Sequence, residues 1–515
     1  MPRTLFLGLD VGDGHLVRRW AADGELPHLQ ALIAQGAWGW LATPAETLHV
    51  SAWPSLYTGT HPGEHGVYYT FQPARGHQGA RRFTGEQYAR PTLWRIASGA
   101  SKRCVVLDAP YTHPESDAGE AVFEWGTWAH YWKPSSSPEG LYKELSRTVG
   151  EYPLGLEANR IGLVSLEPQE LLGKLTTSLA AKARAIRWML ERRPWDLGVS
   201  VFGETHLGTH YLWPGTLEPG AAAEAKPAEL LALYKALDDA IGSVLEATDD
   251  DTAVYVVSGD GGGPNHSGWH LLPEVLRRLG YTKRPGEGDA PPGPPAETND
   301  DAQGQRPRKK GGGLLSKLRG AIPEDLRQAV SRHLPSGVRD ALMKRNRAAE
   351  TDWARTQAYC LPTDLEGCVR FNVKGREPEG IVEPGEVDAL AARLSASIER
   401  LVNPATGEPA AARVVRTKDA FPGDALDDLP DLIVVWDGRA PIASVRSDEV
   451  GTVEEPSPDE RIGTHRPPGF VIARGPGLAP GSELQDADVL DFAPSVLGHL
   501  GVDAPAWMTG RAWTR

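Results

Sequence analysis

Five short apolar runs, bounded by glycine, proline or aspartate, constrain the fold of this chain more than any other feature of its sequence. They cover residues 5–9, 103–107, 197–202, 253–258 and 431–436. Their apolar residues follow one another with little polar interruption, which is typical of strands buried on both faces of a sheet. Amphipathic helical patterns at 27–34, 171–191 and 228–246 lie between several of them. We therefore predict an α/β fold, a doubly wound, mostly parallel sheet with helices on both faces.

The composition narrows the class of protein further. The chain has 515 residues, 40% hydrophobic and 24% charged, so it can bury a large core. Its net charge of −14 argues against general binding of nucleic-acid polymers. The three cysteines, Cys104, Cys360 and Cys368, are too scattered for a disulfide framework, which favours a reducing compartment. No run approaches the roughly 20 apolar residues of a transmembrane segment, and the first residues are too quickly polar for a secretory signal. We expect a cytoplasmic protein.

One region departs from the pattern of strands and helices. Residues 284–350 begin rich in proline and glycine and continue into a basic stretch, so we predict a flexible insertion between a first core part, 1–283, and the remainder of the core, 351–515. Between 306 and 347 there are twelve Lys or Arg and three Asp or Glu. This stretch fits a solvated loop with two short helices, or a docking arm for an anionic substrate, partner or membrane surface.

Residues that can bind metal ions follow three of the predicted strands, and one more lies near the end of the chain. Asp10 follows the first run, and His206 and His210 follow the run at 197–202. Two histidines four positions apart on a helix can reach one divalent ion. Asp260 lies in a glycine-rich turn, and His465 precedes a turn stiffened by prolines. Taken singly, each also fits ordinary turn or core chemistry. Because the carboxyl ends of parallel strands meet at one edge, we predict a dinuclear metal site there.

A longer motif gives these residues a family context. Residues 58–66 read Thr-Gly-x-x-Pro-x-x-His-Gly, within a matching stretch at 51–67, and further matches lie at 7–10, 26–29, 202–210, 257–261, 463–469 and 491–497. In these motifs the chain resembles the alkaline phosphatase superfamily, and within it the type I phosphodiesterase/nucleotide pyrophosphatase branch. The resemblance implies an alkaline-phosphatase-like α/β domain that holds two divalent ions, usually zinc, and cleaves phosphate esters.

The resemblance also implies two sets of metal ligands. The places of the first set fall on His206, His210 and His465, although an aspartate is usual at the first of these. The places of the second set fall on Asp10, on Gly259-Asp260, where the family has Asp-His, and on the nucleophile position, which is His49 here. We interpret Asp10, His49 and Asp260 as a rebuilt second site, because one ligand is lost at Gly259 and another is gained at His49. Zinc, iron or copper fits the first set, and zinc, manganese or iron fits the second.

The nucleophile position leaves the mechanism open. His49 can be a metal ligand, or it can attack phosphorus itself as a covalent nucleophile. Thr47 and Ser51, two positions away on either side, are the conservative alternatives, and water activated by the metal is a fourth. Asn265 and His270 follow Asp260 closely enough to contact substrate.

We therefore predict a dinuclear metal-dependent phosphoesterase, a phosphodiesterase acting on a small phosphorylated metabolite or nucleotide. Two other hypotheses remain open. Three-histidine and mixed histidine/carboxylate sites also bind redox metals, so an oxygen-using metalloenzyme on the same fold is one alternative. A catalytically inactive member that binds a phosphorylated ligand is the other.

Overall fold

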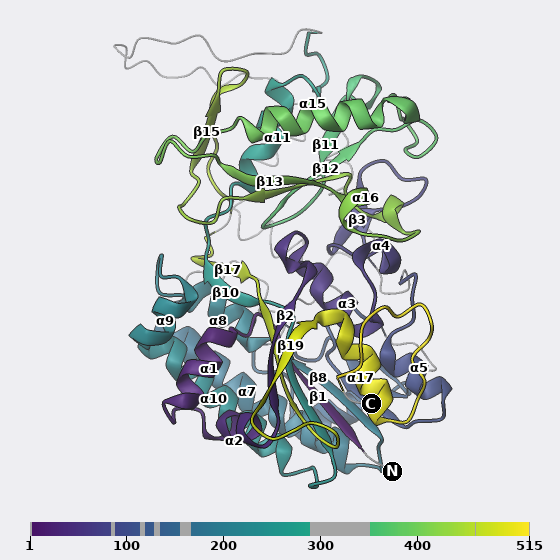
Figure 1. Ribbon diagram of the computed structural model, residues 1–515, viewed down its shortest axis with the longest axis vertical. Helices are drawn as coiled ribbons and strands as arrows, with labels where there is room; N and C mark the ends of the chain where they lie inside the picture. The colour runs from purple at the N-terminus through teal and green to yellow at the C-terminus, as the bar shows by residue number, and fades with distance from the viewer. Residues whose placement is uncertain are drawn as a thin grey trace.

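The protein consists of two units stacked along its long axis in the computed structural model (Figure 1). The structure describes residues 3–83, 88–113, 119–127, 134–154, 166–288, 351–458 and 460–513. Of the predicted insertion at 284–350, only 284–288 lies among them, so the basic stretch is outside the described residues. The larger unit, called the α/β unit below, holds both ends of the chain, and the smaller one contributes an antiparallel sheet.

A nine-stranded sheet forms the centre of the α/β unit. Its order is β19-β2-β18-β9-β1-β8-β5-β6-β7. Five neighbouring pairs are parallel, while β18 runs antiparallel to both of its neighbours and β7 antiparallel to β6. The predicted, mostly parallel sheet is therefore confirmed. Its strands are β1 (Thr4–Leu9), β2 (Ala37–Ala42), β5 (Cys104–Leu107), β6 (Glu120–Phe123), β7 (Ser135–Ser137), β8 (Leu197–Phe202), β9 (Ala253–Ser258), β18 (Gly469–Arg474) and β19 (Ser482–Asp488).

Helices cover both faces of this sheet, and the central strand shows why its sequence is apolar throughout. Leu5, Leu7 and Leu9 pack on one face in the same cluster as residues of the first helices, whereas Phe6 packs on the opposite face with Leu56 and its neighbours. A strand covered on both sides gains stability from every apolar side chain, so its sequence does not need to alternate between apolar and polar residues. The first face is covered by α1 (Gly14–Ala22), α2 (Pro27–Gln35), α7 (Pro168–Glu191) and α10 (Ala228–Leu245), the second by α3 (Ala52–Thr58), α5 (Leu93–Gly99) and α17 (Phe492–His499).

The antiparallel unit (residues 351–454 together with α11) has its own core. Its sheet has the order β11-β12-β14-β13, and α15 lies on the side turned away from the α/β unit (Figure 1). This corrects two expectations, because 351–515 is not simply the rest of one core and the run at 431–436 is not a strand of the parallel sheet. Its elements are α11 (Leu272–Arg278), β11 (Ala358–Cys360), β12 (Gly367–Phe371), α15 (Val387–Glu399), β13 (Ala411–Arg416), α16 (Thr417–Ala420), β14 (Leu432–Trp436), β15 (Ser444–Ser447) and β16 (Gly451–Glu454).

The packing of β14 explains why its sequence was misleading. Leu432 and Val434 pack with α11 and α15, while Ile433 packs on the other face with Leu48 and Tyr68 of the α/β unit. The strand is thus buried on both sides although all its neighbours are antiparallel. A continuous apolar run reports burial on two faces and carries no information on strand direction.

The remaining elements are short and lie mainly around the junction of the units and on the flanks of the α/β unit. These elements are β3 (Phe71–Pro73), β4 (Ala80–Arg82), β10 (Gly261–Pro264), β17 (Gly463–Arg466), α4 (Pro62–His65), α6 (Leu141–Val149), α8 (Glu204–Leu212), α9 (Pro219–Ala225), and the 3-10 turns η1 (Pro44–Glu46), η2 (His49–Ser51), η4 (Trp269–Leu271), η5 (Trp353–Arg355), η6 (Pro384–Glu386), η7 (Leu426–Asp428) and η8 (Val489–Asp491).

Among the described residues no helix is both long and apolar enough to cross a membrane.

Candidate metal centre and active site

Three histidines meet at the carboxyl edge of the parallel strands. His206 and His210 lie one turn apart on α8, which begins directly after β8, and His465 comes from β17. Each offers a ligand atom within 4.8 Å of the other two. The ring centroids are 4.3 Å apart for His206–His210, 5.0 Å for His206–His465 and 5.4 Å for His210–His465. These three residues, the histidine cluster below, are all buried.

Each histidine of the cluster presents its Nδ1 atom to an oxygen. Nδ1 of His206 lies 3.1 Å from Oδ2 of Asp10, and Nδ1 of His465 lies 2.6 Å from Oδ2 of Asp260. Nδ1 of His210 lies 2.8 Å from the carbonyl oxygen of Gly463. At His210 and His465 the oxygen is hydrogen-bonded to Nδ1, which fixes the tautomer with the proton on that atom and makes Nε2 the nitrogen that can bind a metal ion. Nε2 of His210 accepts from Arg461 in this structure, so a metal ion there would replace that donor. The cluster therefore fits a divalent ion with three imidazole ligands.

Electrostatics keeps the cluster in the form that binds metals. Burial, reinforced by neighbouring positive groups, lowers the pKa of His206 and His210 well below 6.5, so both are neutral at physiological pH. Burial also raises the pKa of Asp260, although His465 opposes that effect. Neutral imidazole is the ligand that a metal ion requires, so His206 and His210 need no deprotonation before they bind one.

The local backbone is built around close approaches that only glycine allows. A Cβ on Gly463 would lie 2.0 Å from the carbonyl oxygen of Thr209, so β17 could not lie against α8 with any larger residue there. A Cβ on Gly259 would lie 2.8 Å from Cβ of Ala52 at the start of α3. No side chain fits at Gly259 without displacing α3, which is the physical reason for the missing carboxylate at this position.

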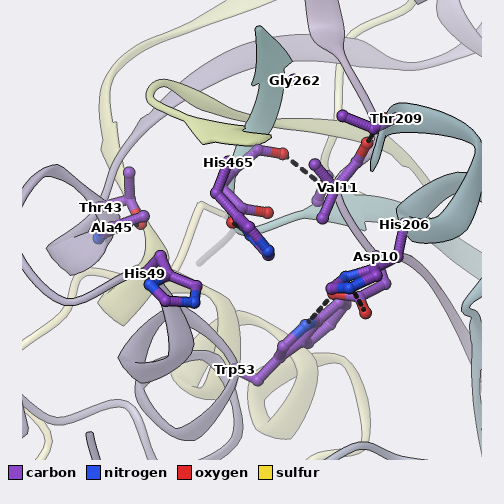
Figure 2. A network of polar contacts seen from close by, with 12 residues as sticks. Asp10, Val11, Thr43, Ala45, His49, Trp53, His206, Thr209, Gly262 and His465 are labelled. Atoms are coloured by element: carbon purple, nitrogen blue, oxygen red, sulfur yellow. Dashed lines mark hydrogen bonds and ion pairs between the residues drawn. The ribbon is translucent and has the colours of Figure 1, made fainter. Parts of the chain in front are cut away.

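The second predicted ligand set, Asp10, His49 and Asp260, is not as closely grouped as the first. Among the described residues, only two groups of three have ligand atoms that all lie within 4.8 Å, and neither contains Asp10, His49 and Asp260 together. Asp10 accepts a hydrogen bond from the indole nitrogen of Trp53 at 2.7 Å and faces His206 (Figure 2). Asp260 faces His465. Both carboxylates thus support the histidine cluster, and a second ion bound by this set stays a prediction.

His49 lies beside the cluster but turns both ring nitrogens toward carboxylates of the other unit. Its ring centroid is 4.4 Å from that of His465, and Figure 2 shows the two rings beside each other. Nδ1 lies 2.9 Å from Oε2 of Glu366, and Nε2 lies 3.3 Å from Oδ1 of Asp364. Burial alone would lower the pKa of His49, but Glu366 and Asp364 outweigh it and raise the pKa to about 10. His49 is therefore a buried imidazolium in this structure.

Sequence reasoning missed the residues that surround His49. Asp364 and Glu366 lie in the hairpin tip (residues 361–366) between β11 and β12, and Arg461 lies just before β17. Nη1 of Arg461 donates to Oδ2 of Asp364 at 2.9 Å and lies 3.3 Å from Nε2 of His210. Burial would raise the pKa of Asp364, but Arg461 and His49 hold it well below its usual range. An acidic pair in a short loop between two apolar strands was the only available signal, and it is typical of exposed turns.

The other predicted site residues have local structural partners. The hydroxyl of Thr47 donates to the carbonyl oxygen of Pro44 at 3.2 Å, and the hydroxyl of Ser51 donates to that of Val67 at 2.8 Å. The side-chain amide of Asn265 donates to the carbonyl oxygen of Arg461 at 3.0 Å. His270 lies in η4 next to Trp269, with 6.2 Å between the ring centroids. Substrate contacts of Asn265 and His270 stay predictions.

Comparisons with known proteins give the chain a context. Residues 4–466 match the family model described as type I phosphodiesterase / nucleotide pyrophosphatase. No curated protein matches the chain.

Three solved structures illustrate the likeness of fold. Phosphonoacetate hydrolase from Sinorhizobium meliloti 1021, in complex with phosphonoformate, has a TM-score of 0.51 and 13% identity, with 97% of this chain and 96% of that chain covered. An alkaline phosphatase PafA mutant has a TM-score of 0.48 and 12% identity, with 100% and 99% covered. Murine ectonucleotide pyrophosphatase/phosphodiesterase 5 has a TM-score of 0.47 and 11% identity, with 98% and 96% covered. At these identities the likeness concerns the fold alone.

Proposed function

The chain belongs to the type I phosphodiesterase / nucleotide pyrophosphatase family, and from that premise we propose that it is a metal-dependent phosphoesterase whose principal ion is held by His206, His210 and His465. The observation that carries this proposal is the oxygen hydrogen-bonded to Nδ1 of His210 and of His465, with Oδ2 of Asp10 3.1 Å from Nδ1 of His206. A buried group of histidines that served packing alone would not need such oxygens, whereas histidines that bind a metal ion commonly have them. Zinc suits three imidazoles with an open position.

The chemistry proposed is hydrolysis of a phosphate ester, with a phosphodiester of a small metabolite or nucleotide as the substrate class. A divalent ion in the cluster supplies Lewis acidity toward a phosphoryl oxygen and a water molecule of lowered pKa. His49 and Arg461 lie next to the cluster as two positively charged donors, suited to bind the phosphoryl oxygens and the charge that develops on them.

His49 is assigned a binding role in this proposal, although it stands at the family's nucleophile position. A covalent nucleophile needs a free lone pair, and both ring nitrogens of His49 face carboxylates. The hydroxyls of Thr47 and Ser51 donate to backbone carbonyls, so neither is activated by an adjacent base. Water is therefore the proposed nucleophile, and Asp10 and Asp260 keep the histidines oriented.

The first experiment is elemental analysis of the purified full-length protein, followed by hydrolysis of bis-p-nitrophenyl phosphate with and without a chelator. We expect about one zinc ion in the cluster, and the His210→Ala variant should lose it together with activity. His28→Ala is the matched control, since His28 belongs to the other group of potential ligands, with Asp238 and Asp239. Iron or copper with no hydrolysis would favour the oxygen-using alternative. Absence of bound metal, or full metal content in His210→Ala, would overturn the proposal.

A further inference from the structure

The antiparallel unit contributes two carboxylates, those of Asp364 and Glu366, to the site of the α/β unit. The hairpin tip that carries Asp364 and Glu366 is tied to the α/β unit on either side. The hydroxyl of Ser267 donates to the carbonyl oxygen of Leu365, and the hydroxyl of Tyr68 donates to that of Pro362 at 3.3 Å. The backbone N–H of His49 also donates to Oε1 of Glu366 at 2.8 Å. These contacts hold both carboxylates in place relative to the histidine cluster.

The two carboxylates balance the two positive charges beside the cluster. Glu366 is paired with His49, and Asp364 lies between His49 and Arg461. Both oxygens of Asp364 are used, and its backbone carbonyl accepts a second hydrogen bond from Arg461 at 3.0 Å. Two buried or half-buried cations and two carboxylates therefore make a group of zero net charge at the mouth of the cluster.

The same balance holds behind the cluster. Asp10 and Asp260 lie against the outer nitrogens of His206 and His465. As ionised carboxylates they would offset the two positive charges of a divalent ion in the cluster. A phosphoryl group that binds here thus meets an ion and two donors whose charges are already compensated by carboxylates. The site therefore stabilises the second negative charge of a phosphomonoester only weakly.

We propose that Asp364 is a specificity-determining residue: by pairing with Arg461 it makes the site prefer phosphoesters that carry one negative charge over phosphoesters that carry two. This inference rests on the proposed function of the same site. It assigns the discrimination to the hairpin tip of the antiparallel unit, and it predicts that removing the Asp364 charge, without changing the shape of the side chain, shifts the preference toward dianions.

The size of the shift follows from the distance between the charges. Asp364 contacts Arg461, whose guanidinium stays charged without it, so removal of the Asp364 charge leaves one uncompensated positive charge beside the cluster. At an effective dielectric constant of about 20, we expect this charge to raise the ratio of dianion to monoanion affinity about tenfold. Removal of the Glu366 charge should leave the ratio nearly unchanged, because His49 loses the carboxylate that keeps it protonated.

The test measures binding of two inert analogues by calorimetry, so it does not depend on turnover. Phenylphosphonate is a dianion in mildly alkaline solution, and its monomethyl ester is a monoanion of nearly the same shape. Both are titrated into the zinc-loaded wild type, into Asp364→Asn, and into Arg461→Gln, which removes the charge that Asp364 compensates. Glu399→Gln is the matched control, because Glu399 is an exposed carboxylate at the end of α15 in the same unit.

The outcomes separate this inference from the function on which it rests. We expect the wild type and the Glu399→Gln control to favour the monoanion, and Asp364→Asn to raise the relative affinity for the dianion about tenfold at unchanged zinc content. Arg461→Gln gives a second, independent result should Asp364→Asn lose zinc or fail to fold, because it should lower the relative affinity for the dianion. An unchanged ratio in a folded, zinc-loaded variant overturns the inference and leaves the phosphoesterase intact. Failure of the zinc-loaded wild type to bind either analogue or hydrolyse any phosphoester overturns the function itself.

Discussion

The two units contribute to the candidate site in opposite ways. The α/β unit supplies the histidine cluster, in which burial keeps His206 and His210 neutral. The antiparallel unit supplies Asp364 and Glu366, whose charges keep His49 positively charged. One side of the site thus presents neutral imidazoles, and the other holds a cation of the protein itself. Because the two sides differ in charge state, they should respond differently to substitution and to pH.

Replacement of His49 should lower stability more than any other single substitution in the site. His49→Gln keeps most of the side-chain volume but leaves Glu366, which is almost fully buried, without a positively charged partner. Breaking a buried ion pair on one side costs about 3 kcal/mol or more of unfolding free energy. Urea unfolding monitored by tryptophan fluorescence measures this loss.

The double variant His49→Gln/Glu366→Gln is the control for that loss. It removes both charges, so we expect it to recover a large part of the free energy of unfolding. Equal losses in the single and double variants would mean that the pair between the units does not contribute through its charge.

Dependence of stability on pH should distinguish the two sides in the metal-free protein. The pKa of His49 is raised from 6.5 to about 10, so its contribution is fully present below pH 6.5 and is lost as pH rises toward 10. The pKa values of His206 and His210 are lowered well below 6.5, so the unfolded chain binds their protons more readily and stability falls as pH drops below 6.5. Each group contributes about 1.4 kcal/mol per pH unit over its range.

Urea unfolding of the chelator-treated protein between about pH 5 and pH 9 checks this pattern. We expect maximal stability near neutral to slightly acidic pH. The alkaline decrease should disappear in His49→Gln, while the acidic decrease should become smaller in His210→Ala. An alkaline decrease that persists unchanged in His49→Gln would show that His49 is not the imidazolium that links the two units.

Sequence reasoning succeeded where the signal was local. The helical pattern at 171–191 corresponds to α7 (Pro168–Glu191), and that at 228–246 to α10 (Ala228–Leu245), because 3.6-residue periodicity reports one buried face. His206 and His210 could be paired because one helical turn separates them. His465 could be added only through the resemblance, since nothing in its own surroundings points to strand β17 and its pairing with the glycines of β10.

The residues of the antiparallel unit could not be predicted in the same way. Asp364 lies 315 positions after His49 in the chain, and their contact depends on how the two units are placed. The run at 431–436 illustrates the same limit, because its apolar residues record burial on two faces without naming the sheet to which the strand belongs. Local pattern therefore paired His206 with His210 and missed the charged groups around His49.

The carboxylates behind the cluster should have a smaller effect, and one confined to metal binding. Asp260→Asn keeps an oxygen for Nδ1 of His465 but removes its charge, so we expect zinc affinity to fall about 10- to 100-fold with little change in fold. Competition with a chromophoric chelator measures the affinity. Asp249→Asn, which alters an exposed carboxylate just before β9, should leave it unchanged. Equal affinities in Asp260→Asn and wild type would mean that Asp260 does not act through the metal.

The smallest effect is expected at the two hydroxyls that flank His49, and it bears directly on where the nucleophile lies. Thr47→Val and Ser51→Ala should each change the rate of phosphodiester hydrolysis by less than about threefold, because both hydroxyls already donate to backbone carbonyls. Ser51→Ala should still lower stability by about 1 kcal/mol, since the carbonyl oxygen of Val67 loses its buried donor. A loss of activity of more than about 100-fold at unchanged stability and zinc content would make that hydroxyl the nucleophile. In that case the hydroxyl would be the catalytic group, and the His49 imidazolium would serve only as a structural link between the units.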